Sequence, residues 1–104
     1  ENKTIGHADA DLSYTLLTPD VRGNIEFCRM SIPPGFTSGR TPQEHIGEEV
    51  AYVMQGTVEI TVAGVSYCLE EGDSIRIPPL TSHQWKNQSG NTVQVIFAIT
   101  PPSF

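Results

Sequence analysis

Two stretches of the chain decide its fold: Gln43-x-His45-x3-Glu49-x6-Gly56 and Gly72-x5-Pro78-x4-His83-x3-Asn87. Imidazole nitrogens, a carboxylate and an amide oxygen are ligands that divalent transition metals accept. The donors at positions 43, 45, 49 and 83 can reach one ion only if strands distant in the sequence lie side by side. The two stretches therefore predict a β-fold together with a metal-binding site, and they do not by themselves name a reaction.

Alternation along the first stretch indicates which side chains converge. Residues two apart in an extended strand share a face, so Gln43 and His45 point the same way. Gly47 permits a sharp connection that brings Glu49 back beside His45. Glu48 is the rival carboxylate, but the six-residue interval to Gly56 favours Glu49.

The second stretch follows the same rule. Trp85 and Asn87 share the face of His83, so both are candidates for binding a ligand next to a metal. Trp85 can stack on a bound molecule or serve as a core residue. Arg29 lies in an otherwise apolar strand, where it can hold an acidic ligand or face the surface or a subunit interface.

Short period-2 segments separated by Gly, Pro, Asn or Asp predict an all-β, antiparallel sandwich or barrel. Residues 1–104 are expected to form one domain, in which residues 1–12 are an arm with little pattern. The predicted strands are Tyr14–Leu17, Ile25–Ile32, Thr41–His45, Val50–Gln55, Val58–Val62, Val65–Leu69, Ser74–Ile77, His83–Lys86 and Val93–Thr100.

Composition excludes several classes of function. The 104 residues carry a net charge of −6 and no cluster of Lys or Arg, so this segment is not expected to bind nucleic acid. No apolar run is long enough to cross a bilayer and no signal peptide opens the chain, so a cytoplasmic location is expected. Cys28 and Cys68 lie in apolar strand patterns and are expected to be buried, reduced thiols.

The two stretches resemble the paired motifs of the cupin family, G-x5-H-x-H-x(3,4)-E-x6-G and G-x5-P-x-G-x2-H-x3-N. The resemblance covers residues 14–104 and implies a double-stranded β-helix, which is a jelly-roll-like antiparallel barrel. It also implies that His45, Glu49 and His83 are metal ligands, with Gln43 in the place of the first histidine.

Further segments are similar to the cupin domain that follows an N-terminal helix-turn-helix in bacterial XRE-type transcription regulators. They are His45-Ile-Gly-Glu-Glu49, Tyr52-Val-Met-Gln-Gly56, Leu16-Leu17-Thr18-Pro19 and Thr100-Pro-Pro-Ser-Phe104. This likeness implies a homodimeric sensor of a small polar effector that touches DNA only through a helix-turn-helix domain absent from the sequence.

Three positions depart from the family pattern. Gln43 replaces a histidine, Leu80 replaces the glycine of the second motif, and the glycine that opens the first motif is out of register. An amide oxygen is a weaker donor than imidazole, so the implied site is His2Glu with Gln43 as an additional ligand or as an amide that contacts the effector. Such a site suits Zn, Fe(II), Mn or Ni; the same residues can also form a polar pocket without metal.

Two other functions use the same residues. One is a stand-alone metal-dependent cupin enzyme, such as a small dioxygenase with an open Fe(II) site. The other is a binding cupin with no DNA partner. Because the fold supports many chemistries, the regulator reading depends on the resemblance and not on the chemistry of the site.

Overall fold

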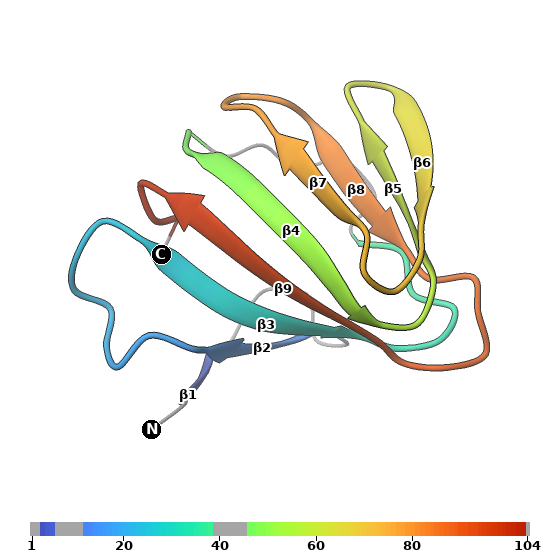
Figure 1. Ribbon diagram of the computed structural model, residues 1–104, viewed down its shortest axis with the longest axis horizontal. Coiled ribbons are helices and arrows are strands. Elements are labelled where there is room, and N and C mark those ends of the chain that lie inside the picture. Colours follow the sequence, from blue (N-terminus) through green and yellow to red (C-terminus); the bar gives the residue numbers. More distant parts are fainter. Residues whose placement is uncertain (1–2, 6–11, 39–45, 104) are drawn as a thin grey trace.

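The computed structural model describes residues 3–5, 12–38 and 46–103, and within these ranges the chain is all-β (Figure 1). Its strands are β1 (Lys3–Ile5), β2 (Ser13–Leu16), β3 (Glu26–Ile32), β4 (Glu48–Gln55), β5 (Val58–Val62), β6 (Val65–Leu69), β7 (Ser74–Ile77), β8 (His83–Lys86) and β9 (Val93–Thr100). The last five coincide with the predicted ranges, and β2, β3 and β4 differ from theirs by one or two residues. The predicted strand Thr41–His45 lies outside the described residues.

The strands form two antiparallel sheets, one with the order β1-β2-β3-β9-β4-β7 and the other with the order β6-β5-β8. Figure 1 shows β9 running between β3 and β4. It pairs with β3 from Glu26↔Ile99 to Ile32↔Val93 and with β4 from Glu48↔Thr100 to Gln55↔Gln94. The end of the chain thus joins two segments that are distant in the sequence.

Side chains alternate strictly across the central strands, as the period-2 pattern predicts. In β9 every second residue from Val93 to Ile99 is buried, and in β3 the inward positions begin with Glu26 and end with Ile32. Full burial of a Val or Ile side chain contributes about 1.5–3 kcal/mol. The inward apolar residues of the two sheets form one hydrophobic core.

Glycine and proline sit where the sequence predicts breaks. Ala63 and Gly64, with φ of 50° and 81°, form the tight turn between β5 and β6. The proline pairs at 33–34, 78–79 and 101–102 lie outside the strands. Position 47 requires glycine because the backbone at Pro101 lies close to it: a Cβ at this position would stand 2.6 Å from the Pro101 carbonyl oxygen.

Two expectations about the edges of the sheets need correction. Lys3–Ile5, inside the predicted arm, pairs with β2 as strand β1, which a three-residue segment is too short to reveal by periodicity. Cys28 is buried as expected, but Cys68 is exposed because β6 is an edge strand whose first four residues face solvent. Among the described residues, no helix that could span a membrane is found.

Candidate functional site

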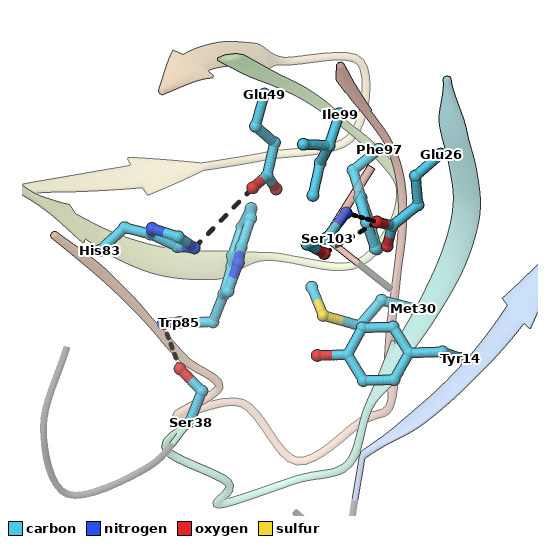
Figure 2. A pocket seen from close by; sticks show the side chains of 10 residues that line it. All are labelled: Tyr14, Glu26, Met30, Ser38, Glu49, His83, Trp85, Phe97, Ile99 and Ser103. Carbon is cyan, nitrogen blue, oxygen red and sulfur yellow. Dashed lines mark hydrogen bonds and ion pairs between the residues drawn. The ribbon is translucent and has the colours of Figure 1, made fainter. Parts of the chain in front are cut away.

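A cavity of about 190 Å³ lies between the two sheets, and polar and aromatic side chains share its wall (Figure 2). Strands β2, β3, β4 and β9 supply one side, and β8 supplies the other. The lining residues are Tyr14, Glu26, Met30, Ser38, Glu49, His83, Trp85, Phe97, Ile99 and Ser103. Glu26, Glu49, His83 and Ser38 are all buried, so polar side chains line the cavity in the interior of the protein.

Glu49 points into this cavity from the start of β4. The alternation of β4 places it on the same face as Ala51 and Val53, while Glu48 faces solvent and pairs with Arg76 at 2.9 Å. Glu49, and not Glu48, is therefore the inward carboxylate, and its role as a metal ligand stays a prediction. Burial, reinforced by the negative charge of Glu26, raises the pKa of Glu49 to about 7.

His83 faces Glu49 from the opposite sheet, as Figure 2 shows. Its Nε2 lies 3.8 Å from Oε1 of Glu49, and both side chains are at most 5% exposed. Its Nδ1 lies 3.4 Å from the Thr81 carbonyl oxygen, a contact that orients the ring with Nε2 toward the carboxylate. Two residues 34 positions apart thus meet, as the paired motifs require.

The other two predicted metal ligands, Gln43 and His45, lie outside the described residues. Within ranges 3–5, 12–38 and 46–103, no three His, Cys, Asp or Glu side chains are grouped closely enough to hold a metal ion. Glu49 and His83 do fit as half of such a site, because an imidazole nitrogen and a carboxylate oxygen 3.8 Å apart can bind one ion after a small adjustment. They are the described residues that would hold it.

Trp85 lines the cavity from β8, with 4% of its surface exposed, and so serves the core and the pocket at once. Its backbone N–H donates to the Ser38 hydroxyl at 2.8 Å, which fixes the strand to the segment after β3. Tyr14 and Phe97 form an edge-to-face pair with ring centroids 5.9 Å apart. The cavity therefore has aromatic side chains from both sheets.

Asn87 shares the inward face of His83 and Trp85, as predicted, but it does not line the cavity. Its amide Nδ2 donates to the carbonyl oxygens of Ile32, Pro33 and Asn91, and its Oδ1 accepts from the backbone N–H and the hydroxyl of Ser89. These hydrogen bonds join two loops. They favour a structural role over contact with a ligand.

Arg29 lies on the other side of the six-stranded sheet. Its position in β3 alternates with buried Cys28 and Met30, so its side chain faces outward, near Met54 and Gln94. The cavity residues given above include neither Lys nor Arg. The structure therefore does not bring Arg29 to the site formed by Glu49 and His83.

Glu26 is the functional candidate that the sequence analysis missed. It is 3% exposed, and its Oε1 accepts hydrogen bonds from the backbone N–H and the hydroxyl of Ser103, both at 2.8 Å. Burial raises the pKa of Cys28 to about 12, and the negative charge of Glu26 adds to this effect. The Cys28 thiol therefore stays protonated. The available signal was a carboxylate on the same strand face as Cys28, Met30 and Ile32.

Comparison with known proteins agrees with this architecture. The family Cupin_2, described as "Cupin domain", matches residues 28–99. This chain is a cupin. The predicted fold class is thereby confirmed, and the two sheets described above are the two halves of the cupin barrel.

Relatives of this cupin include transcription regulators. The HTH-type transcriptional regulator PuuR of Escherichia coli is 35% identical over 71 residues, which is 68% of this chain and 38% of the regulator. The cupin thus spans well under half the length of this relative. The Cupin_2 domain of an XRE family regulator from Enterobacter cloacae has a TM-score of 0.76 at 24% identity over 88% of this chain and 98% of that one.

The fold itself is shared more widely. The cupin domain of Cnp3 from Schizosaccharomyces pombe has a TM-score of 0.80 at 13% identity, with 97% of this chain and 69% of that chain covered. At that identity the likeness concerns the fold alone. The relation to regulator cupins rests on the match to PuuR and on the resemblance of the sequence motifs.

Proposed function

We propose that this cupin is the effector-sensing domain of a helix-turn-helix transcription regulator. The observation that carries the proposal is the cavity between the two sheets, in which buried Glu49 and His83 face each other. The sequence match to PuuR supports the regulator context. A cytoplasmic location and contact with DNA through a separate domain follow from this proposal.

The mechanism is a shift between two arrangements of paired domains. A small polar effector enters the cavity, contacts Glu49 and His83, and stabilises one arrangement of two cupin domains over the other. The change re-spaces the DNA-binding domains attached to them. A coupling free energy of about 1–3 kcal/mol is enough to change DNA affinity roughly 5–150-fold, so a few differential contacts suffice.

A divalent transition metal fits the same proposal. Glu49 and His83 would hold it, together with His45 and Gln43 if these residues reach the cavity. When bound, the ion would supply positive charge for a polar effector group. The protein residues orient the effector, and the buried wall excludes water from it.

DNA binding with and without candidate effectors tests the sensing role. The regulator that contains this cupin should bind its operator in an effector-dependent way, whereas residues 1–104, with a net charge of −6, should not bind duplex DNA. Glu49→Gln should alter the effector response and leave effector-free operator binding unchanged. An operator affinity that no effector changes would refute the sensing role.

Elemental analysis of protein purified without chelator tests the metal. We expect up to one transition metal per chain, and we expect His83→Ala to lose it while Lys86→Ala, which changes an exposed residue on the same strand, retains it. Full metal content in the His83 variant would rule out this assignment.

The pair of Glu49 and His83 also favours a second candidate, a metal-dependent enzyme. Incubation with Fe(II), oxygen and small metabolites distinguishes it from a sensor. Turnover that disappears in Glu49→Ala would replace the sensing role with an oxygenase activity.

A further inference from the structure

The cavity has a second polar end, away from His83, that no assigned role uses. Glu26, Tyr14, Met30, Phe97 and Ser103 surround it, and we refer to these five residues as the Glu26 subsite (Figure 2). They come from β2, β3, β9 and the segment after β9. Their combination of a carboxylate, two aromatic rings and a thioether is distinct from the donor pair of Glu49 and His83.

The carboxylate of Glu26 is buried and is still a strong acceptor. Oε1 takes two hydrogen bonds from Ser103, whereas Oε2 has a thiol contact with Cys28 Sγ at 3.9 Å. A carboxylate offers about four acceptor positions and a thiol is a weak donor. Oε2 can therefore accept a further, charge-assisted hydrogen bond, which is shorter and about twice as strong as a neutral one.

The walls beside Glu26 suit a positive charge on an organic group. Tyr14 and Phe97 belong to this end of the cavity, and an ammonium within about 6 Å of an aromatic ring face is attracted by it. Met30 adds a polarizable thioether that packs against methylene groups. A hydrated inorganic ion gains little from such walls, whereas an alkylammonium gains from both the rings and the carboxylate.

Without a bound metal ion, the charge of the cavity disfavours an anionic ligand. Two buried carboxylates, Glu26 and Glu49, line it, and its described wall contains no Lys or Arg. An anionic ligand would add a like charge to a site of low dielectric constant, which is unfavourable. A cavity of about 190 Å³ has room for a small organic molecule, since one water needs only about 10–15 Å³ of such a volume.

We propose that the Glu26 subsite binds the ammonium group of a small organic cation, whose carbon chain extends toward Trp85. Oε2 of Glu26 accepts a hydrogen bond from the ammonium, and Tyr14 and Phe97 enclose the charge. This rests on the proposed sensing function and names the chemical class of its effector. It places the recognition of charge at Glu26, which the cupin motifs do not include.

A set of three matched probes tests the assignment, with Trp85 as the reporter. Trp85 is the sole tryptophan of the chain and lines the cavity, so its fluorescence reports occupancy. The purified chain is titrated with pentylammonium, pentanol and pentanoate in chelator and an amine-free buffer. We expect pentylammonium to bind at least tenfold more tightly than pentanol, and we expect pentanoate to bind more weakly than either.

Two variants test whether Glu26 causes the preference for a cationic ligand. Glu26→Gln should reduce the ratio of pentylammonium to pentanol affinity at least tenfold. Glu48→Gln changes the net charge equally but lies outside the cavity, and it should keep the wild-type ratio. If Glu26→Gln does not fold, the order of the three probes on the wild-type chain still decides the matter.

Three results would overturn the proposal: equal or tighter binding of pentanol or pentanoate, no saturable response to pentylammonium, or an unchanged probe ratio in Glu26→Gln. A preference for pentanoate would overturn the ligand class and leave the sensing function in place. Failure of the sensing function shows instead as an operator affinity that no effector alters. The two failures are therefore distinguishable.

Discussion

At the scale of single residues, the two buried carboxylates shape the cavity electrostatically. Glu26 and Glu49 are both 3% exposed, and the negative charge of Glu26 adds to the burial that raises the pKa of Glu49. Folding an ionised Glu49 into this place costs free energy, which a proton, a metal ion or an organic cation offsets. The buried carboxylates therefore do not serve the stability of the fold when both are ionised and no cation is bound.

The stability of the protein should therefore depend on pH through Glu49. Its pKa is about 7 in the folded chain against an ordinary 4.5, so the folded state holds the proton more tightly. This contribution is fully present below pH 4.5 and is lost as the pH rises through 7, by on the order of 3 kcal/mol. Urea denaturation at pH 4.5 and pH 8, in chelator, should show the loss in the wild type and not in Glu49→Gln.

Glu48→Gln is the control for this measurement, because its side chain is 47% exposed and beside Arg76. It should keep the wild-type difference between the two pH values. Parallel stabilities of wild type and Glu49→Gln across the range would contradict the assignment of the shift to Glu49.

Asn87 is the second residue whose side chain should contribute strongly to the stability of the fold. Replacement by Ala leaves the carbonyl oxygens of Ile32, Pro33 and Asn91 without its amide donor, in a place where Asn87 is fully buried. Thermal or urea unfolding should show a loss of roughly 2–4 kcal/mol. Asn91→Ala, which removes an exposed side chain, should cost about 0.5 kcal/mol or less.

Ligand-binding measurements should show that Asn87 has a structural role and does not contact a ligand in the cavity. Because Asn87 does not line it, the Trp85 fluorescence response of folded Asn87→Ala to pentylammonium should equal that of the wild type. A selective loss of binding without a loss of stability would restore Asn87 as a ligand-contacting residue.

At the scale of elements, the connection between β7 and β8 keeps a backbone shape that suits glycine. Leu80 has φ of 56° and is 67% exposed, at the position where the second cupin motif has glycine. A left-handed conformation costs a residue with a Cβ roughly 1–2 kcal/mol. Leucine thus replaces the glycine of the motif at position 80, while the backbone there keeps the left-handed conformation.

Leu80→Gly should stabilise the protein. The relief of backbone strain is partly offset by the greater freedom of glycine in the unfolded chain, which leaves a gain of about 0.5–1 kcal/mol. Leu80→Ala is the matched control: it removes the same exposed side chain but keeps the Cβ, so it should give no such gain. Equal unfolding midpoints of the two variants would show that φ at position 80 carries no cost.

At the scale of the whole molecule, the outer face of the six-stranded sheet exposes several apolar side chains. Cross-strand rows on the outside of the six-stranded sheet align Phe27, Ala98 and Val50, and then Arg29, Ile96 and Tyr52. Phe27, Val50, Tyr52 and Met54 are between 37% and 49% exposed. Contiguous apolar area of this kind on a sheet marks an interaction surface, so we expect a symmetric homodimer through this face.

Sedimentation equilibrium at micromolar concentration tests this assembly, which should bury more than about 2,000 Å² in total. Tyr52→Glu should shift the protein toward monomer, because it places a charge at the centre of the face. Tyr67→Glu is the control, since Tyr67 is similarly exposed, at 46% against 43%, but lies on β6 of the other sheet. A wild-type monomer, or equal effects of both variants, would exclude this face.

The sequence by itself determined most of the described strands and the inward side of several of them. Alternation and turn residues predicted the bounds of β5 to β9 and put Trp85 on the face of His83, and the six-residue interval to Gly56 favoured Glu49 over Glu48 as the inward carboxylate. These properties are local, because the period of a strand and the shape of a turn depend on neighbouring residues. The paired motifs added a long-range statement, the approach of Glu49 to His83.

Only the tertiary structure decided what each inward side chain meets. Alternation shows that Glu26 and Asn87 point inward, but not that Glu26 faces a cavity while Asn87 closes a loop. It also does not reveal that β6 is an edge strand, which exposes Cys68, or that Arg29 faces away from the site. These outcomes depend on the strand order within the two sheets and on how the sheets pack, which sequence periodicity does not specify, since each strand can pair with many partners in the same alternation.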